Sequence, residues 1–364
     1  MDFSIGEDRQ MLVDTLSRYL ADRFPWEVRS AALESEEGFS RDVWAGLAEL
    51  GVLGALFGED VGGFGGSPFD AGVVFAEVGR GLALGPFLGT LMAGKLLEAA
   101  REEDTLASVI GGEAILTFAD SRAVNEDGSM APAVQAAHAG DDWLLTGTKG
   151  VVEYLGSADL VVVTAQVAEG EAAFLLDPNT GGAHVRDYKL VDGGAAGELV
   201  LEGAEARRLR GVDADAIAAA RALGVVATCW EAVAVMEVLR DTTLDYLRTR
   251  KQFGVPIGKF QALQHRMATV ALEIEQARSA AINAAARFGE DPVIRDKFAS
   301  AAKYTCGSVG RLTAEEAIQM HGGIGMTWEL PLSHFAKRLT MLGQVLGDED
   351  EHLARYIELS REAA

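Results

Sequence analysis

Two adjacent cations, an aromatic ring and a glycine follow one another in the segment Arg250–Gly254 (RKQFG). An arginine can bind a pyrophosphate through paired donors, and a phenylalanine can pack against a flat ring. The segment therefore predicts a phosphate or nucleotide site at the end of a helix. A basic pair before a turn is also typical of a solvated helix end, which is the alternative interpretation.

A glycine-rich segment near the C-terminus, Ile318–Gly325 (IQMHGGIG), is the second candidate. Backbone approaches a phosphate closely only where side chains are absent, and Gly322 and Gly323 meet that condition. A turn that closes a helix is the alternative interpretation of these glycines.

The charge of the chain restricts its partners. The 364 residues carry a formal net charge of -23, which argues against nucleic acid as a partner and disfavours anionic ligands at long range. A nucleotide cofactor therefore needs a local basic cluster, and the region near position 250 supplies one. The two cysteines, Cys229 and Cys306, are expected to be buried free thiols, and the six histidines lack metal-site spacing.

The chain is expected to be cytoplasmic and not to enter a membrane. No uninterrupted apolar stretch reaches about 18 residues. The first ten residues, MDFSIGEDRQ, are acidic and lack the layout of a signal peptide.

The periodicity of apolar residues changes twice along the sequence, from helical to strand-like and back to helical. This pattern predicts an α+β protein in three parts. Residues 1–112 are expected to form an N-terminal helical domain. Its first apolar residues are expected to lie broadly on one side of a helix: Phe3, Met11, Leu12, Leu16 and Leu20. Residues 113–206 are expected to form a small antiparallel β-barrel or sandwich, and residues 207–364 a four-helix bundle. The expected strands are Trp143–Thr146, Leu160–Gln166, Ala172–Leu176 and Glu198–Glu202, and the expected long helices are Ala218–Leu239, Phe260–Phe288 and Asp291–His321.

Several spaced motifs together resemble the acyl-CoA dehydrogenase family over nearly the whole chain. Residues 250–268 resemble its R-x-x-F-G-x-x-(I/L)-x-x-F-Q-x-x-(Q/K)-H-x-(L/M)-A motif. Ile318–Gly325 resembles its Q-x-x-G-G-x-G loop, and Glu329 and Pro331 follow as in its E-x-P motif. Gly58–Arg80, which continues into GLALGP, resembles its N-terminal helical region.

The resemblance implies an FAD-dependent enzyme that dehydrogenates acyl-CoA and passes electrons to an electron-transfer flavoprotein. In that family the flavin ring lies between the β-domain and the C-terminal bundle of one subunit of a tetramer. A neighbouring subunit holds the ADP half of FAD. By resemblance, the residues that hold pyrophosphate and adenosine here are Arg250, Phe253, Gln319, Gly322 and Gly323.

The family's catalytic carboxylate is missing. Its usual Glu takes the substrate's α-proton while a hydride leaves the β-carbon for the flavin. Counting on from Pro331, that Glu falls on Leu346, followed by a matching Gly347 and then Asp348. Loss of a general base typically costs about 10²–10⁴-fold in rate. We therefore assign no catalytic residue in this chain.

Other carboxylates are poor substitutes for the missing base. The alternative base position of some family members falls on Gly224, and Glu231 lies about two turns further along the same helix. Asp348 could serve after a small shift of its loop, but an acid at a helix start more simply caps it.

The segments expected to face the flavin ring also depart from the family. Leu116–Ser121 (LTFADS) stands where T-E-P-G is frequent, and Lys149–Glu153 (KGVVE) where K-x-W-I-T/S is frequent. The resemblance is thus to the Glu-lacking subunit of α2β2 bacterial acyl-CoA dehydrogenases, whose partner, a Glu-bearing homologue, completes two shared FAD sites. Such pairs are associated with bulky acyl-CoA esters, including steroid side chains.

Three alternatives remain open at the level of sequence. The first is a self-sufficient homotetramer that uses Asp348 or Glu231 as a displaced base. The second is a scaffold subunit that binds CoA esters or another protein without flavin. The third is a flavin oxidase or monooxygenase on the same fold.

Overall fold

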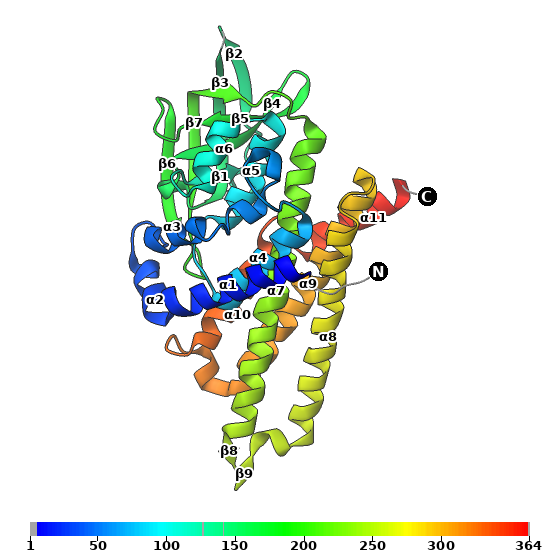
Figure 1. Ribbon diagram of the computed structural model, residues 1–364. Helices are drawn as coiled ribbons and strands as arrows, with labels where there is room; N and C mark the ends of the chain where they lie inside the picture. The colour runs from blue at the N-terminus through cyan, green and yellow to red at the C-terminus, as the bar shows by residue number, and fades with distance from the viewer. Residues whose placement is uncertain (1–5, 126, 141, 363–364) are drawn as a thin grey trace. The chain divides into compact units, whose positions relative to one another are not determined.

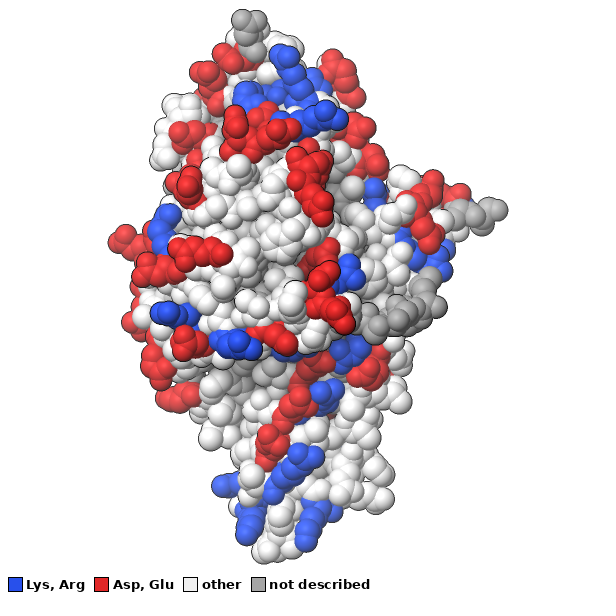
Figure 2. Space-filling view, viewed as in Figure 1, with Lys and Arg blue, Asp and Glu red and all other residues white. Residues whose placement is uncertain are grey.

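A computed structural model describes residues 6–125, 127–140 and 142–362 of the chain (Figure 1). Phe3 lies outside these residues. The chain forms two compact units, one of Met1–Val74 and Ala83–Gly224, the other of Phe75–Leu82 and Val225–Ala364. The visible face carries many acidic side chains, in keeping with the net charge (Figure 2).

The N-terminal part of the first unit is helical, as expected. Its helices are α1 (Glu7–Arg23), α2 (Trp26–Glu34), α3 (Arg41–Glu49), the first half of α4 (Pro68–Gly81), α5 (Phe87–Ala100) and α6 (Glu103–Ile110). Helix α1 buries only Leu16 and Leu20, whereas Met11 is exposed. Helix α5 is apolar and buried almost all round, so it lies inside this unit.

The strands of the first unit close into a small barrel. They are β1 (Leu116–Ala119), β2 (Gln135–Ala139), β3 (Asp142–Glu153), β4 (Leu160–Val167), β5 (Gly170–Leu176), β6 (Ala183–Lys189) and β7 (Ala195–Arg208). The pairings β4–β2–β3–β7–β5–β4 form a ring, with β1 added to β4 and β6 added to β7. All four expected strands lie within these elements, which confirms them. The sequence did not reveal that β1 pairs with β4 in parallel.

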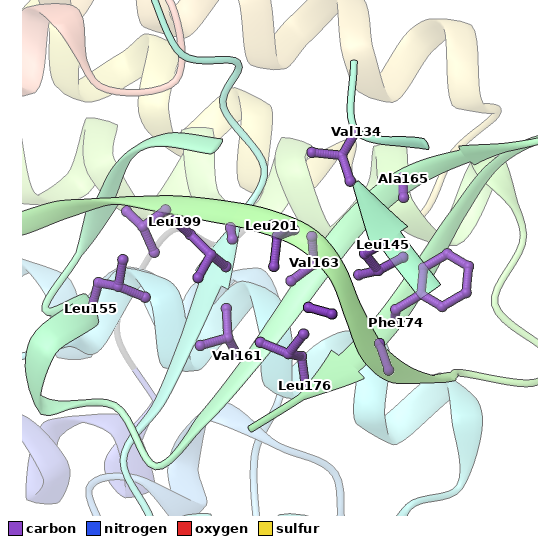
Figure 3. Packing of buried hydrophobic residues seen from close by; sticks show 14 of the residues in the cluster. Val134, Leu145, Leu155, Val161, Val163, Ala165, Phe174, Leu176, Leu199 and Leu201 are labelled. Atoms are coloured by element: carbon purple, nitrogen blue, oxygen red, sulfur yellow. The ribbon is translucent and has the colours of Figure 1, made fainter. Parts of the chain in front are cut away.

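Alternating apolar residues from these strands fill the barrel (Figure 3). Val163, Phe174 and Leu199 are fully buried. Since successive residues of a strand point to opposite faces, this alternation fixes which face of each strand turns inward.

A buried polar cluster lies at the end of β1. Lys149 is 4% exposed and donates to the carbonyl of Asp120 and the hydroxyl of Thr164, both at 2.8 Å. Arg221 binds both carboxylate oxygens of Asp120 and both of Glu171. Burial opposes ionisation of Asp120, but the bonds and charge of Arg221 hold its pKa below the usual value. The cluster joins β1, β3, β4 and β5 to the start of α7 (Ala214–Thr249).

The second unit is a helical bundle. It contains the later part of α7, followed by α8 (Gln261–Ala286), α9 (Pro292–His321), α10 (Pro331–Gln344) and α11 (Glu349–Glu362). A two-stranded hairpin, β8 (Lys251–Gln252) and β9 (Val255–Pro256), joins α7 to α8. The order of helices, strands and helices confirms the expected α+β class, while the boundaries at residues 112 and 206 stay a prediction.

Helix α7 is the one described helix long and apolar enough to cross a membrane, but most of its apolar stretch is buried in the protein. That is the environment of a core helix. Cys229 of α7 and Cys306 of α9 are both buried and free.

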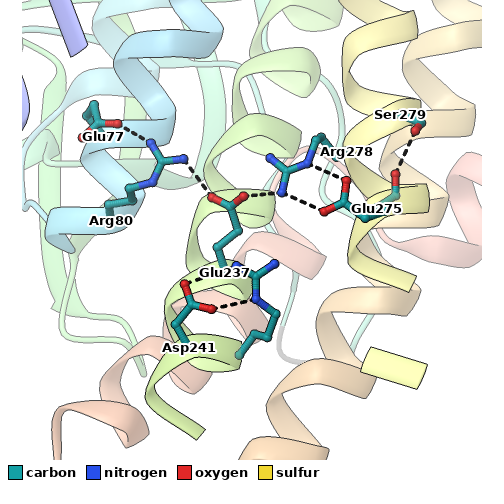
Figure 4. Close-up of polar contacts among 8 residues, drawn as sticks. Glu77, Arg80, Glu237, Asp241, Glu275, Arg278 and Ser279 are labelled. Carbon is teal, nitrogen blue, oxygen red and sulfur yellow. Dashed lines mark hydrogen bonds and ion pairs between the residues drawn. The ribbon is translucent and has the colours of Figure 1, made fainter. Parts of the chain in front are cut away.

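A chain of ion pairs connects three helices of this unit (Figure 4). Arg80, at the end of α4, binds Glu77 and lies 2.8 Å from Glu237 of α7. Arg278 of α8 binds the same Glu237 and, at 3.0 Å, Glu275. Because Glu77 is 3% exposed, its ion pair with Arg80 offsets part of the cost of burying a carboxylate.

We predict that Lys149 makes stability depend on alkaline pH. Burial lowers the pKa of Lys149 to about 8, from 10.5. Between these values the unfolded chain binds more protons than the folded chain, so the free energy of unfolding should rise with pH across this window, on the order of 3 kcal/mol in all.

Urea unfolding of the wild type and of Lys149→Met gives the free energy of unfolding of each protein from pH 7.5 to 10.5. The difference between the two plots of this free energy against pH measures the contribution of Lys149. Parallel curves would show that Lys149 keeps an ordinary pKa in the folded protein.

Candidate functional site

The hairpin between α7 and α8 presents a strained aromatic residue. Phe253 and Gly254 form its two-residue turn, and both have left-handed backbones, with φ of 54° and 80°. A two-residue hairpin turn with positive φ at both positions suits glycine or asparagine, and a bulky residue there costs about 1–3 kcal/mol. Phe253 is nevertheless 92% exposed. Its ring packs edge-on against the Phe260 ring, with a distance of 6.2 Å between the ring centroids. The ring is therefore open to contact by a ligand or a partner.

Positive charge gathers around this hairpin. Residues 246–272 contain five cations and no Asp or Glu: Arg248, Arg250, Lys251, Lys259 and Arg266. Figure 2 shows the Lys and Arg side chains at this end. Arg266 binds Glu316 through two hydrogen bonds, which neutralises an acid on the neighbouring α9. Arg250 is exposed and makes no ion pair with any described residue, so its guanidinium is available to an anion.

The glycine segment at the end of α9 is open. Gln319 is exposed, α9 ends at His321, and Gly322 has φ of 68°. A Cβ at Gly322 or Gly323 would have nothing within 4 Å, so a phosphate could approach the backbone there. Gly325 differs, because a Cβ there would lie 3.0 Å from both His321 Cβ and the carbonyl of Ile318.

The structure brings the hairpin and the glycine segment to one end of the bundle. Leu247 of α7, Met267 of α8 and Met320 of α9 form one apolar cluster. The rings of Tyr246 and His321 stack beside it, with centroids 4.3 Å apart.

The end of the bundle that contains the five predicted cofactor residues is called the nucleotide end below. It offers an available guanidinium, an exposed ring and open backbone. These features suit pyrophosphate and adenosine, although a role for the five residues in holding FAD stays a prediction.

No carboxylate occupies the expected position of the base. Leu346 is half-buried in the loop between α10 and α11, and it and Gly347 have φ of 60° and 102°. His352 lies with Nε2 2.9 Å from the Leu346 carbonyl, and buried Lys303 donates to the carbonyl of Leu342 at the end of α10. The loop is therefore held firmly around a side chain that cannot take a proton.

Asp348 caps a helix. It accepts a hydrogen bond from the Glu351 N–H at 2.9 Å, and its own N–H donates to the Glu351 carboxylate at 3.2 Å. This reciprocal pair is a capping box at the start of α11, which agrees with the simpler interpretation of this acid.

Glu231 is committed to an ion pair. Its side chain is 2% exposed, and both oxygens accept hydrogen bonds from Arg338, at 2.6 and 2.9 Å. Loss of one partner from a buried pair costs about 3–5 kcal/mol, so proton abstraction by Glu231 would be unfavourable. Gly224, the other expected base position, lies within α7.

The segment expected to face a flavin ring is altered in the first unit. Lys149 points into the polar cluster at the end of β1. Val151 is half-exposed with φ of 51°, and its N–H donates to the Tyr188 hydroxyl at 3.1 Å. Glu153 is half-buried, where the family pattern has a hydroxyl.

Sequence reasoning missed Tyr246 and His321. Their positions in the sequence could have indicated a place near the candidate site, because Tyr246 lies one helical turn before Arg250 and His321 directly precedes Gly322. Their contact could not be foreseen, because 75 residues separate them.

Comparison with known proteins supports the resemblance. Residues 216–355 match the acyl-CoA dehydrogenase C-terminal domain, and residues 6–105 match the N-terminal domain. The chain is 31% identical to acyl-CoA dehydrogenase FadE27 of Mycobacterium tuberculosis over 82% of this chain and 83% of the relative.

Two solved structures are similar over nearly their whole length. The ChsE4-ChsE5 complex from Mycobacterium tuberculosis contains a chain that is 28% identical with a TM-score of 0.91, covering 100% of this chain and 99% of that one. The Tcur3481-Tcur3483 steroid ACAD G363A variant gives 28% identity and a TM-score of 0.91, with 99% of each chain covered. With its helical, barrel and bundle parts in the family's order, the chain belongs to the acyl-CoA dehydrogenase family, whose cofactor is FAD.

Proposed function

We propose that this chain is the base-lacking subunit of a heteromeric acyl-CoA dehydrogenase. It supplies the nucleotide end to an FAD that a Glu-bearing homologue completes, in an α2β2 assembly with two FAD. The observation that carries the proposal is an asymmetry within the chain. The nucleotide end is open and basic, whereas Leu346 is aliphatic and Asp348 and Glu231 are engaged in structural contacts.

The nucleotide end would hold the ADP half of FAD. Arg250 would donate paired hydrogen bonds to the pyrophosphate, and the Phe253 ring would pack against the adenine. Open backbone at Gly322 and Gly323, with the Gln319 amide beside it, would complete the contact. FAD, when bound, accepts the hydride that leaves the β-carbon of the acyl-CoA. The α-proton would go to the partner's glutamate, because this chain offers no available carboxylate at that position.

The names of the similar structures support the pairing and suggest the substrate. Each names two chains, and one of them is called a steroid ACAD. A bulky acyl-CoA ester such as a steroid side chain is therefore the substrate class we propose. An electron-transfer flavoprotein would accept the electrons, and the assembly would work in the cytoplasm.

The first test concerns FAD retention. Arg250→Ala in the complex should weaken FAD binding about 10- to 100-fold, because a charge-assisted hydrogen bond is worth about 1.5–3 kcal/mol. Arg248→Ala is the matched control, since Arg248 is exposed at the same helix end but pairs with Asp245 at 3.3 Å.

The flavin absorbance that remains after desalting, together with titration of the flavin-free complex, gives the result. Equal FAD binding by the wild type and Arg250→Ala would favour the scaffold alternative.

The second test concerns the source of the base. Asn is as good an N-cap as Asp, so Asp348→Asn keeps the cap of α11 and removes the carboxylate. We expect the complex carrying Asp348→Asn to turn over within about 2-fold of the wild type, and Gln in place of the partner's glutamate to lower turnover by at least about 10²-fold.

The isolated wild-type chain should show no bleaching of flavin absorbance when acyl-CoA is added. Bleaching by the isolated chain that disappears in Asp348→Asn would establish the self-sufficient homotetramer instead. Dioxygen consumption during turnover would identify the oxidase alternative.

A further inference from the structure

The nucleotide end contains a pair of rings that link its two segments. Tyr246 lies on α7 one turn before Arg250, and His321 is the last residue of α9, directly before Gly322. The rings stack with a centroid distance of 4.3 Å and an interplanar angle of 24°. The Tyr246 hydroxyl also donates to the His321 carbonyl, over a long 3.4 Å. The stacked ring surfaces, more than this weak hydrogen bond, make the contact.

His321 is fixed from within its own helix. Its side chain is 6% exposed, and Nδ1 lies 2.8 Å from the Ala317 carbonyl, so the proton of the neutral ring sits on Nδ1. Burial lowers the pKa of His321, which keeps the ring uncharged near neutral pH.

The glycine segment packs against the base of the His321 side chain. The turn η5 (Gly322–Met326) begins where α9 ends, and its buried Gly325 approaches so closely that a Cβ would lie 3.0 Å from His321 Cβ. Because His321 directly precedes Gly322 and its ring is held by the stack with Tyr246, a shift of His321 would displace the turn that carries Gly322 and Gly323. On the other side, a shift of Tyr246 would displace the end of α7 and the hairpin that follows.

We infer that the stacked Tyr246 and His321 form a positioning element, which sets the spacing between the Arg250 hairpin and the Gly322–Gly323 backbone before a nucleotide binds. Neither ring needs to touch the ligand. The apolar cluster of Leu247, Met267 and Met320 joins helices α7, α8 and α9. The stacked rings connect the end of α7, which leads into the Arg250 hairpin, with the end of α9, which leads into Gly322 and Gly323. An anion site ordered in advance binds more tightly, because less conformational entropy is lost on binding.

The claim that the rings improve nucleotide binding rests on the proposed function. The claim that the rings set the spacing of the two segments does not. The structural part is testable without FAD, by amide hydrogen exchange of the full-length chain. His321→Ala removes the ring, and His321→Phe keeps a ring that can stack. Exchange at residues 249–257 and 322–326 should accelerate in His321→Ala and stay near wild type in His321→Phe.

The ligand part is tested by FAD titration of the flavin-free complex. An aromatic pair is worth about 0.5–1.5 kcal/mol, so His321→Ala should raise the apparent Kd for FAD about 2- to 12-fold, and His321→Phe should restore it. Because Tyr246 is half-buried, Tyr246→Leu and Tyr246→Phe give the same comparison from the other ring if His321→Ala fails to fold.

Wild-type rates of amide exchange at residues 249–257 and 322–326 in both His321→Ala and Tyr246→Leu would overturn the inference. Equal effects of His321→Ala and His321→Phe would do the same, because they would assign the role to the imidazole nitrogens. Failure of the proposed function gives a different pattern: Arg250→Ala then binds FAD like the wild type, while the exchange data still decide whether the rings couple the two segments.

Discussion

A dianionic pyrophosphate can be held by a protein of net charge -23 only where carboxylates are kept away from the binding groups. The bundle meets this constraint by local sequence and by pairing. Residues 246–272 contain no acid, and Arg266 neutralises Glu316, an acid that α9 brings close. At physiological salt the charge of more distant acids is largely screened beyond about 8 Å. The attraction of an anion to this end of the bundle therefore depends more on the charges nearby than on the net charge of the chain.

The loop at Leu346, the expected position of the base, is shaped by contacts that do not involve the side chain at this position. Two consecutive left-handed residues, a buried lysine against the end of α10 and a histidine against the Leu346 carbonyl all shape the loop. These contacts hold α10 and α11 in place, so the fold needs them whichever side chain stands at position 346. An aliphatic residue there cannot transfer a proton, and it leaves these contacts intact.

Much of this molecule was predictable from local patterns, and the remainder depends on contacts between distant residues. Apolar periodicity predicted α8, α9 and the strands of the barrel, because one face of each element is buried. Motif spacing predicted that Arg250 and the Gly322–Gly323 backbone hold the cofactor. The structure brings them to one end of the bundle, and their role stays a prediction.

Contacts between distant residues were not predictable in the same way. The pairing of Glu231 with Arg338 spans 107 residues and the stack of Tyr246 on His321 spans 75. The inward orientation of Lys149 depends on Thr164 of β4 and on Asp120, which directly follows β1. No local pattern encodes such contacts, and the left-handed Phe253 even runs against local preference.

The exposure of Phe253 bears on how the proposed subunit would be produced. A strained aromatic tip surrounded by cations is a poor surface for a protein that remains alone, since chaperones and proteases recognise exposed apolar groups and anionic polymers attract basic ones. If the tip is covered only on assembly, an excess of this chain over its partner is an orphan pool subject to degradation. The proposed assembly would then require balanced synthesis of its two chains.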